Sequence, residues 1–121
     1  MRGKTLLMGA NDNPEKYAYR CATGLISRGY PVVLFGHKEG QVMGEKIITS
    51  LPDHIDDLET VTLYLGPARQ KEFYAKILAL KPKRVLFNPG TENPEFEKML
   101  KDAGIEAPEV CNLVMLSTGT F

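Results

Sequence analysis

The sequence predicts one doubly wound α/β domain, and three observations favour it. At 121 residues and 43% hydrophobic content, the chain has the size of one domain and enough apolar side chains for a core. Short apolar runs alternate with stretches of helical periodicity, which favours parallel strands joined by right-handed helical crossovers. The runs are continuously apolar, as in strands that helices cover on both faces. We therefore expect a single domain over residues 1–121, with five parallel strands in the order 3-2-1-4-5 at Lys4–Met8, Val32–Phe35, Val61–Leu65, Arg84–Phe87 and Ile105–Val110.

The first forty residues have the pattern of a strand–helix–strand unit with a glycine turn. The apolar run Lys4–Met8 ends abruptly at Gly9-Ala10-Asn11, and an amphipathic run from Glu15 to Arg28 follows it. A second apolar run, Val32–Phe35, completes the unit. In such units the turn after the first strand and the following helix N-terminus hold a phosphate group. The turn lacks the second and third glycines of the G-x-G-x-x-G pattern, so it indicates a nucleotide ligand other than ordinary NAD.

The middle of the chain predicts two strands and a helix. Lys46–Thr49 is typical of a weak, short strand, and Asp53–Leu58 has the length of one helical turn. Val61–Leu65 predicts a buried strand that ends at a Gly-Pro pair. The next stretch, Ala68–Leu80, carries apolar residues at helical spacing and predicts a helix.

The last third of the chain predicts two more strands and two helices. Arg84–Phe87 is the fourth strand of the sheet. Asn93 is a good N-cap with Pro94 at the first helical position, so a helix is expected to begin there. Ile105–Val110 predicts a last strand, weakened by an internal proline, and Cys111–Leu116 is expected to form a short helix.

Charge and composition disfavour several classes of function. Lys plus Arg and Asp plus Glu both number 15, and a net charge of zero disfavours a nucleic-acid or polybasic membrane surface. No apolar run approaches the length of a membrane span, and the N-terminal run is too short for a signal peptide. The two cysteines are too few and too far apart for a disulfide framework. We therefore expect a cytoplasmic protein with reduced thiols that binds a small-molecule nucleotide ligand.

Four predicted strands end in small or turn-forming residues, and these supply the candidate binding residues. Ligands of open α/β sheets bind at the carboxyl ends of the strands, where the strand order reverses. One glycine at a strand end makes only a turn, but four such ends on one edge favour a shared cleft. Two cations fit a phosphate there: Arg20 near the start of the first helix, and Lys38 after the second strand, where a phosphorylated ribose is favoured. The candidate residues are Gly9, Ala10, Asn11, Arg20, Gly36, His37, Lys38, Gly66, Pro67 and Asn88.

Several short motifs resemble the small stand-alone CoA-binding proteins, which are related to the CoA-binding domain of the succinyl-CoA synthetase alpha subunit. The matching motifs are Gly9-Ala10-Asn11, Asn13-Pro14, Tyr19-Arg20, Gly29-Tyr30-Pro31-Val32, Gly44-Glu45-Lys46 and Ser50-Leu51. The loop Gly36-His37-Lys38-Glu39-Gly40 is similar to the synthetase loop Gly-Lys-x-Gly with one residue inserted. The resemblance implies a Rossmann-like fold and binding of CoA or an acyl-CoA, and for the stand-alone members it implies no settled reaction.

Two departures from the family pattern bear on the ligand. Many members end the second strand in Val-Asn-Pro, where this chain has Leu34-Phe35-Gly36. Many carry a Phe-Arg pair after the third strand, where this chain has Gly66-Pro67-Ala68-Arg69. Both departures lie at strand ends, so they imply a change in the affinity for the ligand or in its identity.

The sequence contains no recognisable catalytic set and no metal-ligand spacing. His37 and His54 are the only histidines, and neither belongs to a triad-like pattern. Cys111 follows the last predicted strand and is interpreted as a packing residue, with thiol exchange as its chemical alternative. We expect a CoA- or acyl-CoA-binding module without catalysis of its own. The alternatives are an enzyme that is NAD(P)-dependent or exchanges thiols through Cys111, and a regulatory domain with a vestigial cleft and an unknown protein partner.

Overall fold

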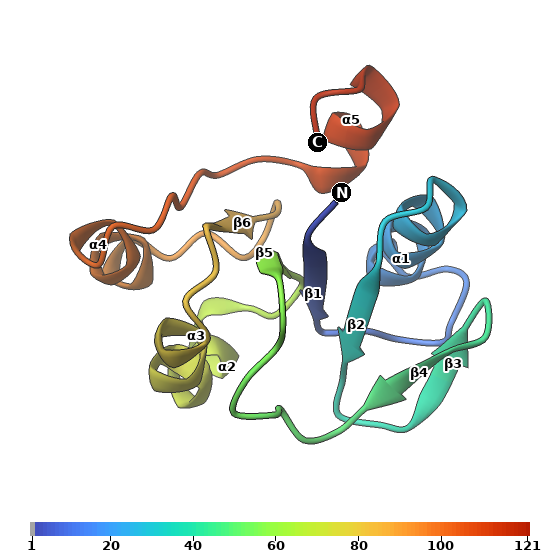
Figure 1. Cartoon of the computed structure of the whole chain (residues 1–121), viewed down its shortest axis with the longest axis horizontal. Helices are drawn as coiled ribbons and strands as arrows, with labels where there is room; N and C mark the ends of the chain where they lie inside the picture. The colour runs from blue at the N-terminus through green and yellow to red at the C-terminus, as the bar shows by residue number, and fades with distance from the viewer. Residues whose placement is uncertain (1) are drawn as a thin grey trace.

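A sheet of six strands in the order β3-β4-β2-β1-β5-β6 forms the centre of the molecule (Figure 1). The computed structural model describes residues 2–121. Every neighbouring pair is parallel except β3 and β4, which form an antiparallel hairpin at one edge. The fold is therefore α/β with a mostly parallel sheet. The strands are β1 Lys4–Met8, β2 Val32–Phe35, β3 Gly40–Val42, β4 Glu45–Ile48, β5 Leu58–Leu63 and β6 Arg84–Phe87.

Helices cover both faces of the sheet (Figure 1). Successive side chains of a strand point to opposite faces. Leu6 and Met8 of β1 therefore enter the core under α3 and α4, and Leu7 enters the core under α1 and α5. The helical elements are α1 Tyr17–Ser27, α2 Pro67–Gln70, the 3-10 turn η1 Lys71–Phe73, α3 Tyr74–Leu80, α4 Pro94–Asp102 and α5 Asn112–Thr118.

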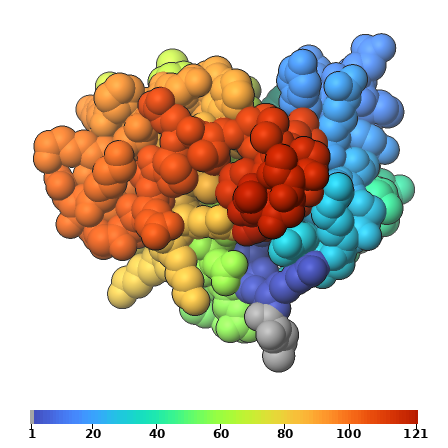
Figure 2. Space-filling view, turned by 90° about the horizontal axis from the view of Figure 1, so that it is seen from above, coloured from blue at the N-terminus to red at the C-terminus, as the bar shows by residue number. Residues whose placement is uncertain are grey.

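The C-terminal helix α5 lies against α1 (Figure 2). Gly24 of α1 permits this close approach, because a Cβ atom there would lie 3.0 Å from Cδ1 of Leu116. Beyond α5, the Phe121 ring packs edge-on to Tyr30 with 4.9 Å between ring centroids, and the Arg84 guanidinium carbon lies 4.6 Å from the centroid of the Phe121 ring. The chain end beyond α5 is thereby held beside Tyr30 and the amino end of β6, while the first residue of α5, Asn112, donates its N–H to Asn88, which follows β6.

The predicted strand order 3-2-1-4-5 is wrong. The third predicted strand, observed as β5, pairs with β1 and does not lie beyond β2. The position beyond β2 is taken by β4, which pairs through Leu34 with Ile47 and Phe35 with Ile48. The reversal of strand order still lies beside β1, as the candidate cleft requires. The last predicted strand, Ile105–Val110, is an extended segment that joins β6 only at two isolated parallel bridges.

The predicted helices differ from the observed ones mainly in the middle of the chain. The stretch Ala68–Leu80 is divided into α2, η1 and α3. The predicted helical turn at Asp53–Leu58 is not formed, and β5 begins at Leu58. The start of α4 is confirmed, since the Asn93 side chain accepts a hydrogen bond from the Phe96 N–H at 3.2 Å. The short final helix is also confirmed and begins at Asn112.

Candidate functional site

The carboxyl ends of β1, β2 and β5 meet closely because glycines stand where their backbones approach. Gly9 adopts a φ of +97°, and a Cβ atom there would lie 2.7 Å from the Tyr64 carbonyl oxygen. A Cβ atom on Gly36 would overlap the carbonyl oxygen of Ala10. Side chains at these two positions would push the strand ends apart, so both glycines are required for the compact edge on which the candidate site lies.

The loop between β1 and α1 uses its own polar groups to keep its shape. The N–H groups of Gly9 and Ala10 both donate to the Phe35 carbonyl oxygen, at 2.9 and 2.8 Å. The Asn11 side chain accepts from the Asn13 N–H at 2.8 Å. The N–H groups of Gly9, Ala10 and Asn13 are therefore occupied, whereas the first N–H groups of α1 have no partner within the helix and are open to a ligand.

The N-terminus of α1 carries no side-chain cap. Its N-cap residue, Lys16, makes no side-chain capping hydrogen bond, and the first turn contains no acidic residue. The first N–H groups of a helix have no partner within the helix, and the helix dipole makes this end positive. A hollow of about 220 Å³ adjoins this end, and we call it the loop hollow; its lining residues are Gly9, Asn11, Lys16, Tyr17, Ala18 and Tyr64.

A second hollow adjoins the first and differs from it in chemistry. It has a volume of about 310 Å³ and lies at the ends of β5 and β6, beside the start of α5. Both hollows are lined by Tyr17 and Tyr64, and none of the residues that line the second is charged. We call the second one the apolar hollow and the pair the strand-end groove; the apolar hollow is lined by Tyr17, Tyr64, Asn88, Pro89, Cys111 and Leu113.

Asn88 fixes the floor of the apolar hollow. Its side-chain NH₂ donates to the Thr62 hydroxyl at 2.8 Å and to the Leu63 carbonyl at 2.9 Å. Its side-chain oxygen accepts from the Asn112 N–H at 2.8 Å. Asn88 is only 1% exposed. One buried amide therefore joins β5, β6 and α5, so Asn88 positions the site.

A buried polar cluster lies behind the apolar hollow. Burial raises the pKa of the Cys21 thiol to about 12, so it stays protonated at neutral pH. Burial also raises the pKa of Tyr64, and the neighbouring Cys21 raises it further. The Tyr64 hydroxyl and both polar side-chain atoms of Asn112 are buried without a hydrogen-bond partner. Such groups are rare in folded proteins.

Several predicted site residues do not line the strand-end groove. His37 and Lys38 are exposed in the loop between β2 and β3, whose start packs against Ala10 through Gly36. Gly66 and Pro67 are exposed and begin α2. Ala10 is itself buried. Gly9, Asn11 and Asn88 do line the groove.

Arg20 is connected to the groove only through Tyr17. Its guanidinium carbon lies 5.4 Å from the centroid of the Tyr17 ring, which is 67% exposed. This is within the range of a cation–π contact, but Arg20 itself is exposed and does not line either hollow.

Sequence reasoning did not identify Lys16, Tyr17, Tyr64, Pro89 and Leu113 as site residues. Tyr64 immediately follows β5, and Tyr17 is the first residue of α1, so their positions relative to strand ends were a usable signal. Leu113 gave no such signal, because α5 reaches the groove only through the packing of the C-terminal segment on α1.

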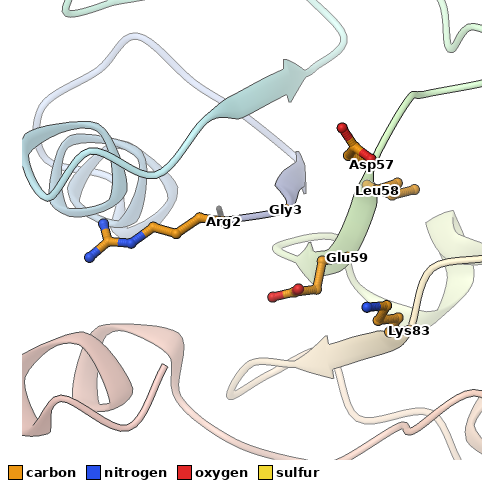
Figure 3. A pocket seen from close by; sticks show the side chains of 6 residues that line it. All are labelled: Arg2, Gly3, Asp57, Leu58, Glu59 and Lys83. Carbon is orange, nitrogen blue, oxygen red and sulfur yellow. The ribbon is translucent and has the colours of Figure 1, made fainter.

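Another hollow lies at the opposite, amino-terminal edge of the sheet (Figure 3). It has a volume of about 280 Å³ and carries Asp57, Glu59 and Lys83. The Arg2 side chain points away from the other labelled residues, and its guanidinium carbon lies 4.1 Å from the centroid of the Tyr30 ring. Acidic and basic side chains both line this hollow, so it has no excess of either charge.

Two further findings concern metal-binding clusters and membrane-spanning helices in residues 2–121. No group of three or more His, Cys, Asp or Glu side chains in this part of the chain is arranged to hold a metal ion. Across the same residues, none of the helices combines the length and apolar character that crossing a membrane requires.

Residues 3–117 match a protein family described as the CoA binding domain. No curated protein matches the chain.

Solved structures share the fold over nearly the whole chain. A protein described only as uncharacterised is 49% identical, with a TM-score of 0.95, over 100% of this chain and 99% of its own. A Thermus thermophilus protein is 26% identical, with a TM-score of 0.87, over 99% and 91% of the two chains. A hypothetical protein from Pyrococcus horikoshii OT3 is 28% identical, with a TM-score of 0.84, over 97% of this chain and 83% of its own.

Proposed function

Since the chain belongs to the CoA-binding domain family, we propose that it binds CoA or an acyl-CoA in the strand-end groove, without catalysis of its own. The observation that carries this proposal is the uncapped N-terminus of α1, which adjoins the loop hollow beside Lys16. CoA combines an anionic pyrophosphate with a long uncharged arm. The groove offers a positive end and an uncharged end in direct succession, which matches that order of groups.

The pyrophosphate is assigned to the loop hollow. The free N–H groups of the first turn of α1 donate to phosphate oxygens, and the helix dipole favours the negative charge. Lys16 lines the same hollow and adds a full positive charge. The sequence predicts a phosphate over the turn Gly9-Ala10-Asn11 and the following helix N-terminus, and this assignment keeps the helix N-terminus because the Gly9 and Ala10 N–H groups are bound to Phe35.

The adenosine side is assigned to the loop between β2 and β3. Gly36 begins this loop and lies against Ala10, so the loop borders the phosphate end of the groove. Its exposed Lys38 is the cation that we assign to the 3′-phosphate of CoA. His37 precedes it in the same loop and is also exposed.

The absence of catalysis is inferred from the surroundings of the reactive groups. His54 is exposed and lies 2.7 Å from Asp56, in the segment just before β5 begins and therefore at the opposite edge from the groove. Neither histidine lines the strand-end groove beside Cys111. A nucleophilic thiol needs a neighbouring base or cation that holds it as a thiolate, and the lining of the apolar hollow supplies neither.

Isothermal titration calorimetry with CoA, NAD and NADP tests the proposal. We expect CoA to bind and NAD and NADP to bind more weakly. Lys16→Ala should weaken CoA binding by about fivefold, the effect of losing one partly exposed charge contact. Lys71→Ala is the matched control, because Lys71 is an exposed lysine that lines neither hollow. Binding of NAD without binding of CoA would overturn the proposal.

A further inference from the structure

We infer that the apolar hollow receives the acyl group of an acyl-CoA, and that it selects short uncharged acyl groups over acyl groups that carry a carboxylate. This inference rests on the proposed function and deepens it by naming the class of thioester. Three features of the hollow carry it: its position beside the loop hollow, its uncharged lining and its size.

The position of the hollow fits the far end of the ligand. Tyr17 and Tyr64 line both hollows, so a molecule that leaves the loop hollow passes these two rings and enters the apolar hollow. With the pyrophosphate at the start of α1, the arm that ends in the thioester points toward Asn88, Cys111 and Leu113. The acyl group, which lies beyond the thioester sulfur, is then the part of the ligand that fills the hollow.

The lining discriminates by charge. It consists of two tyrosines, Asn88, a proline, a cysteine and a leucine, with no side chain of either charge. A carboxylate that enters such a site loses its hydration and gains no cation in return, which is costly. Arg20, which lies against the Tyr17 ring, is exposed and lines neither hollow, and Lys16 lines only the loop hollow.

Unpartnered polar groups adjoin the same hollow. Tyr64 lines it, and Asn112 lies between the lining residues Cys111 and Leu113. Among residues 2–121, the buried side-chain atoms without a partner all belong to these two residues. These atoms are themselves shielded from solvent, so they belong to the wall behind the hollow and are not contact points for the arm of CoA.

The size of the hollow limits the acyl chain. Its volume is about 310 Å³, and a water in the liquid takes up about 30 Å³, so it holds roughly ten non-hydrogen atoms. The thioester end of the arm takes some of this space, which leaves room for an acyl group of about four carbons. Longer chains would have to emerge past the exposed Tyr17.

Calorimetry on the unmodified protein with CoA, acetyl-CoA, butyryl-CoA and succinyl-CoA tests the inference. Each buried methylene strengthens binding by about fourfold, so butyryl-CoA, which has two more than acetyl-CoA, should bind roughly fifteenfold more tightly. Succinyl-CoA has a four-carbon acyl group that ends in a carboxylate, so it should bind at least tenfold more weakly than butyryl-CoA. Equal affinities for butyryl-CoA, succinyl-CoA and CoA would overturn the inference.

Two variants of Leu113 with a matched control localise the effect. Leu113→Trp fills the hollow, so butyryl-CoA should lose its advantage over both acetyl-CoA and CoA. Val114→Trp places the same side chain on the adjacent residue of α5, which is 55% exposed and does not line the hollow, so the preference should persist. Leu113→Ala enlarges the hollow and should shift the preference toward a longer acyl chain. This variant still tests the inference if Leu113→Trp does not fold.

The outcomes separate this inference from the proposed function. If none of the four thioesters or thiols binds, the proposed function fails. If CoA binds but the acyl group changes nothing, the proposed function stands and the apolar hollow is not an acyl site. If Val114→Trp and Leu113→Trp abolish the preference equally, the acyl group lies elsewhere and the inference is overturned.

Discussion

Gly36 and Gly9 illustrate, at the scale of single residues, what the sequence conveys about a site and what it omits. A glycine at the end of a strand predicts a turn or a close approach, and both residues do make close approaches. The partner in each approach is a backbone far along the chain, Tyr64 for Gly9 and Ala10 for Gly36. The sequence therefore identified the positions but not the contacts, because the contacts depend on which strands become neighbours.

The hydrogen bonds of Phe35 are a second example at this scale. Its carbonyl oxygen accepts from both Gly9 and Ala10, which belong to the turn that the sequence predicts to hold a phosphate together with the following helix N-terminus. A pattern of residue types does not reveal such occupied donors. The exposed cation Lys38, in contrast, was recognised from its position after β2 alone, and its proposed role stays a prediction.

Replacement of Lys38 tests that role. Lys38→Ala should weaken CoA binding by about fivefold and leave dephospho-CoA binding nearly unchanged, because only CoA has the 3′-phosphate that the ammonium would meet. Calorimetry with both ligands measures the difference. Lys46→Ala is a suitable control, since Lys46 is also exposed and lies in β4, close to the same loop. Equal weakening of both ligands would assign Lys38 to the pyrophosphate or to the shape of the loop.

The two cysteines predict a thiol-labelling pattern. Cys21 is fully buried and burial raises its pKa to about 12, so it should not react with a thiol reagent at neutral pH in the folded protein. Cys111 is half-buried, with no cation in the lining beside it, and should react more slowly than a free thiol. Cys111→Ser should remove the remaining reactivity. Labelling of Cys111 much faster than a free thiol, blocked by CoA, would favour thiol chemistry over binding alone.

At the scale of elements, strongly patterned segments were predicted well and weakly patterned ones were not. Arg84–Phe87 and Lys4–Met8 coincide with β6 and β1, because continuous apolar runs between turn residues leave few alternatives. The hairpin of β3 and β4 is short and lies at the sheet edge, and only Ile47 and Ile48 pair with β2. The sequence predicts a weak strand at Lys46–Thr49, which overlaps β4, but its place beside β2 follows from tertiary packing. The predicted order left this strand out of the sheet and put the third predicted strand beyond β2.

The junction of β5, β6 and α5 depends on Asn88. Asn88→Ala leaves the Thr62 hydroxyl, the Leu63 carbonyl and the Asn112 N–H without their buried partner. We expect a loss of about 3 kcal/mol in the free energy of unfolding, measured by urea denaturation. Labelling of Cys111 should also become faster, because α5 is no longer held at its first residue.

Asn13→Ala is the control for this variant. Asn13 is exposed, and its side chain accepts only from the Glu15 N–H nearby in the chain. Its removal should cost less than about 1 kcal/mol and leave Cys111 labelling unchanged. If Asn88→Ala were as stable as Asn13→Ala, the three buried hydrogen bonds would not hold the floor of the groove.

At the scale of the whole molecule, the polar groups are distributed unevenly. Formal charges balance to zero, yet the strand-end groove has a positive end at α1 and an uncharged end at α5. On the other face of the sheet, the carboxyl group of Glu109 lies beside Glu97, and the buried Glu97 accepts a hydrogen bond from the Asn93 N–H at 2.9 Å. The net charge of the chain therefore predicts neither the positive end of the strand-end groove nor the Glu97–Glu109 pair, because both depend on which helices and strands pack together.

This acidic pair makes the stability of the whole molecule depend on pH. A hydrogen bond shared with Glu97, together with the charge of Glu97, raises the pKa of Glu109 above its usual range. The folded protein therefore holds a proton that the unfolded chain has released, and this contribution to stability is present at low pH and is lost as the pH rises through the raised pKa. In Glu109→Gln the side chain donates to Glu97 at every pH. The variant should thus match the original protein near pH 4 and be more stable at pH 7, as measured by thermal unfolding. Glu106→Gln changes an exposed residue of the same extended segment and should show no such pH-dependent gain in stability. An equal gain in both variants would mean that general repulsion among acidic residues, and not the Glu97–Glu109 contact, causes the change of stability with pH.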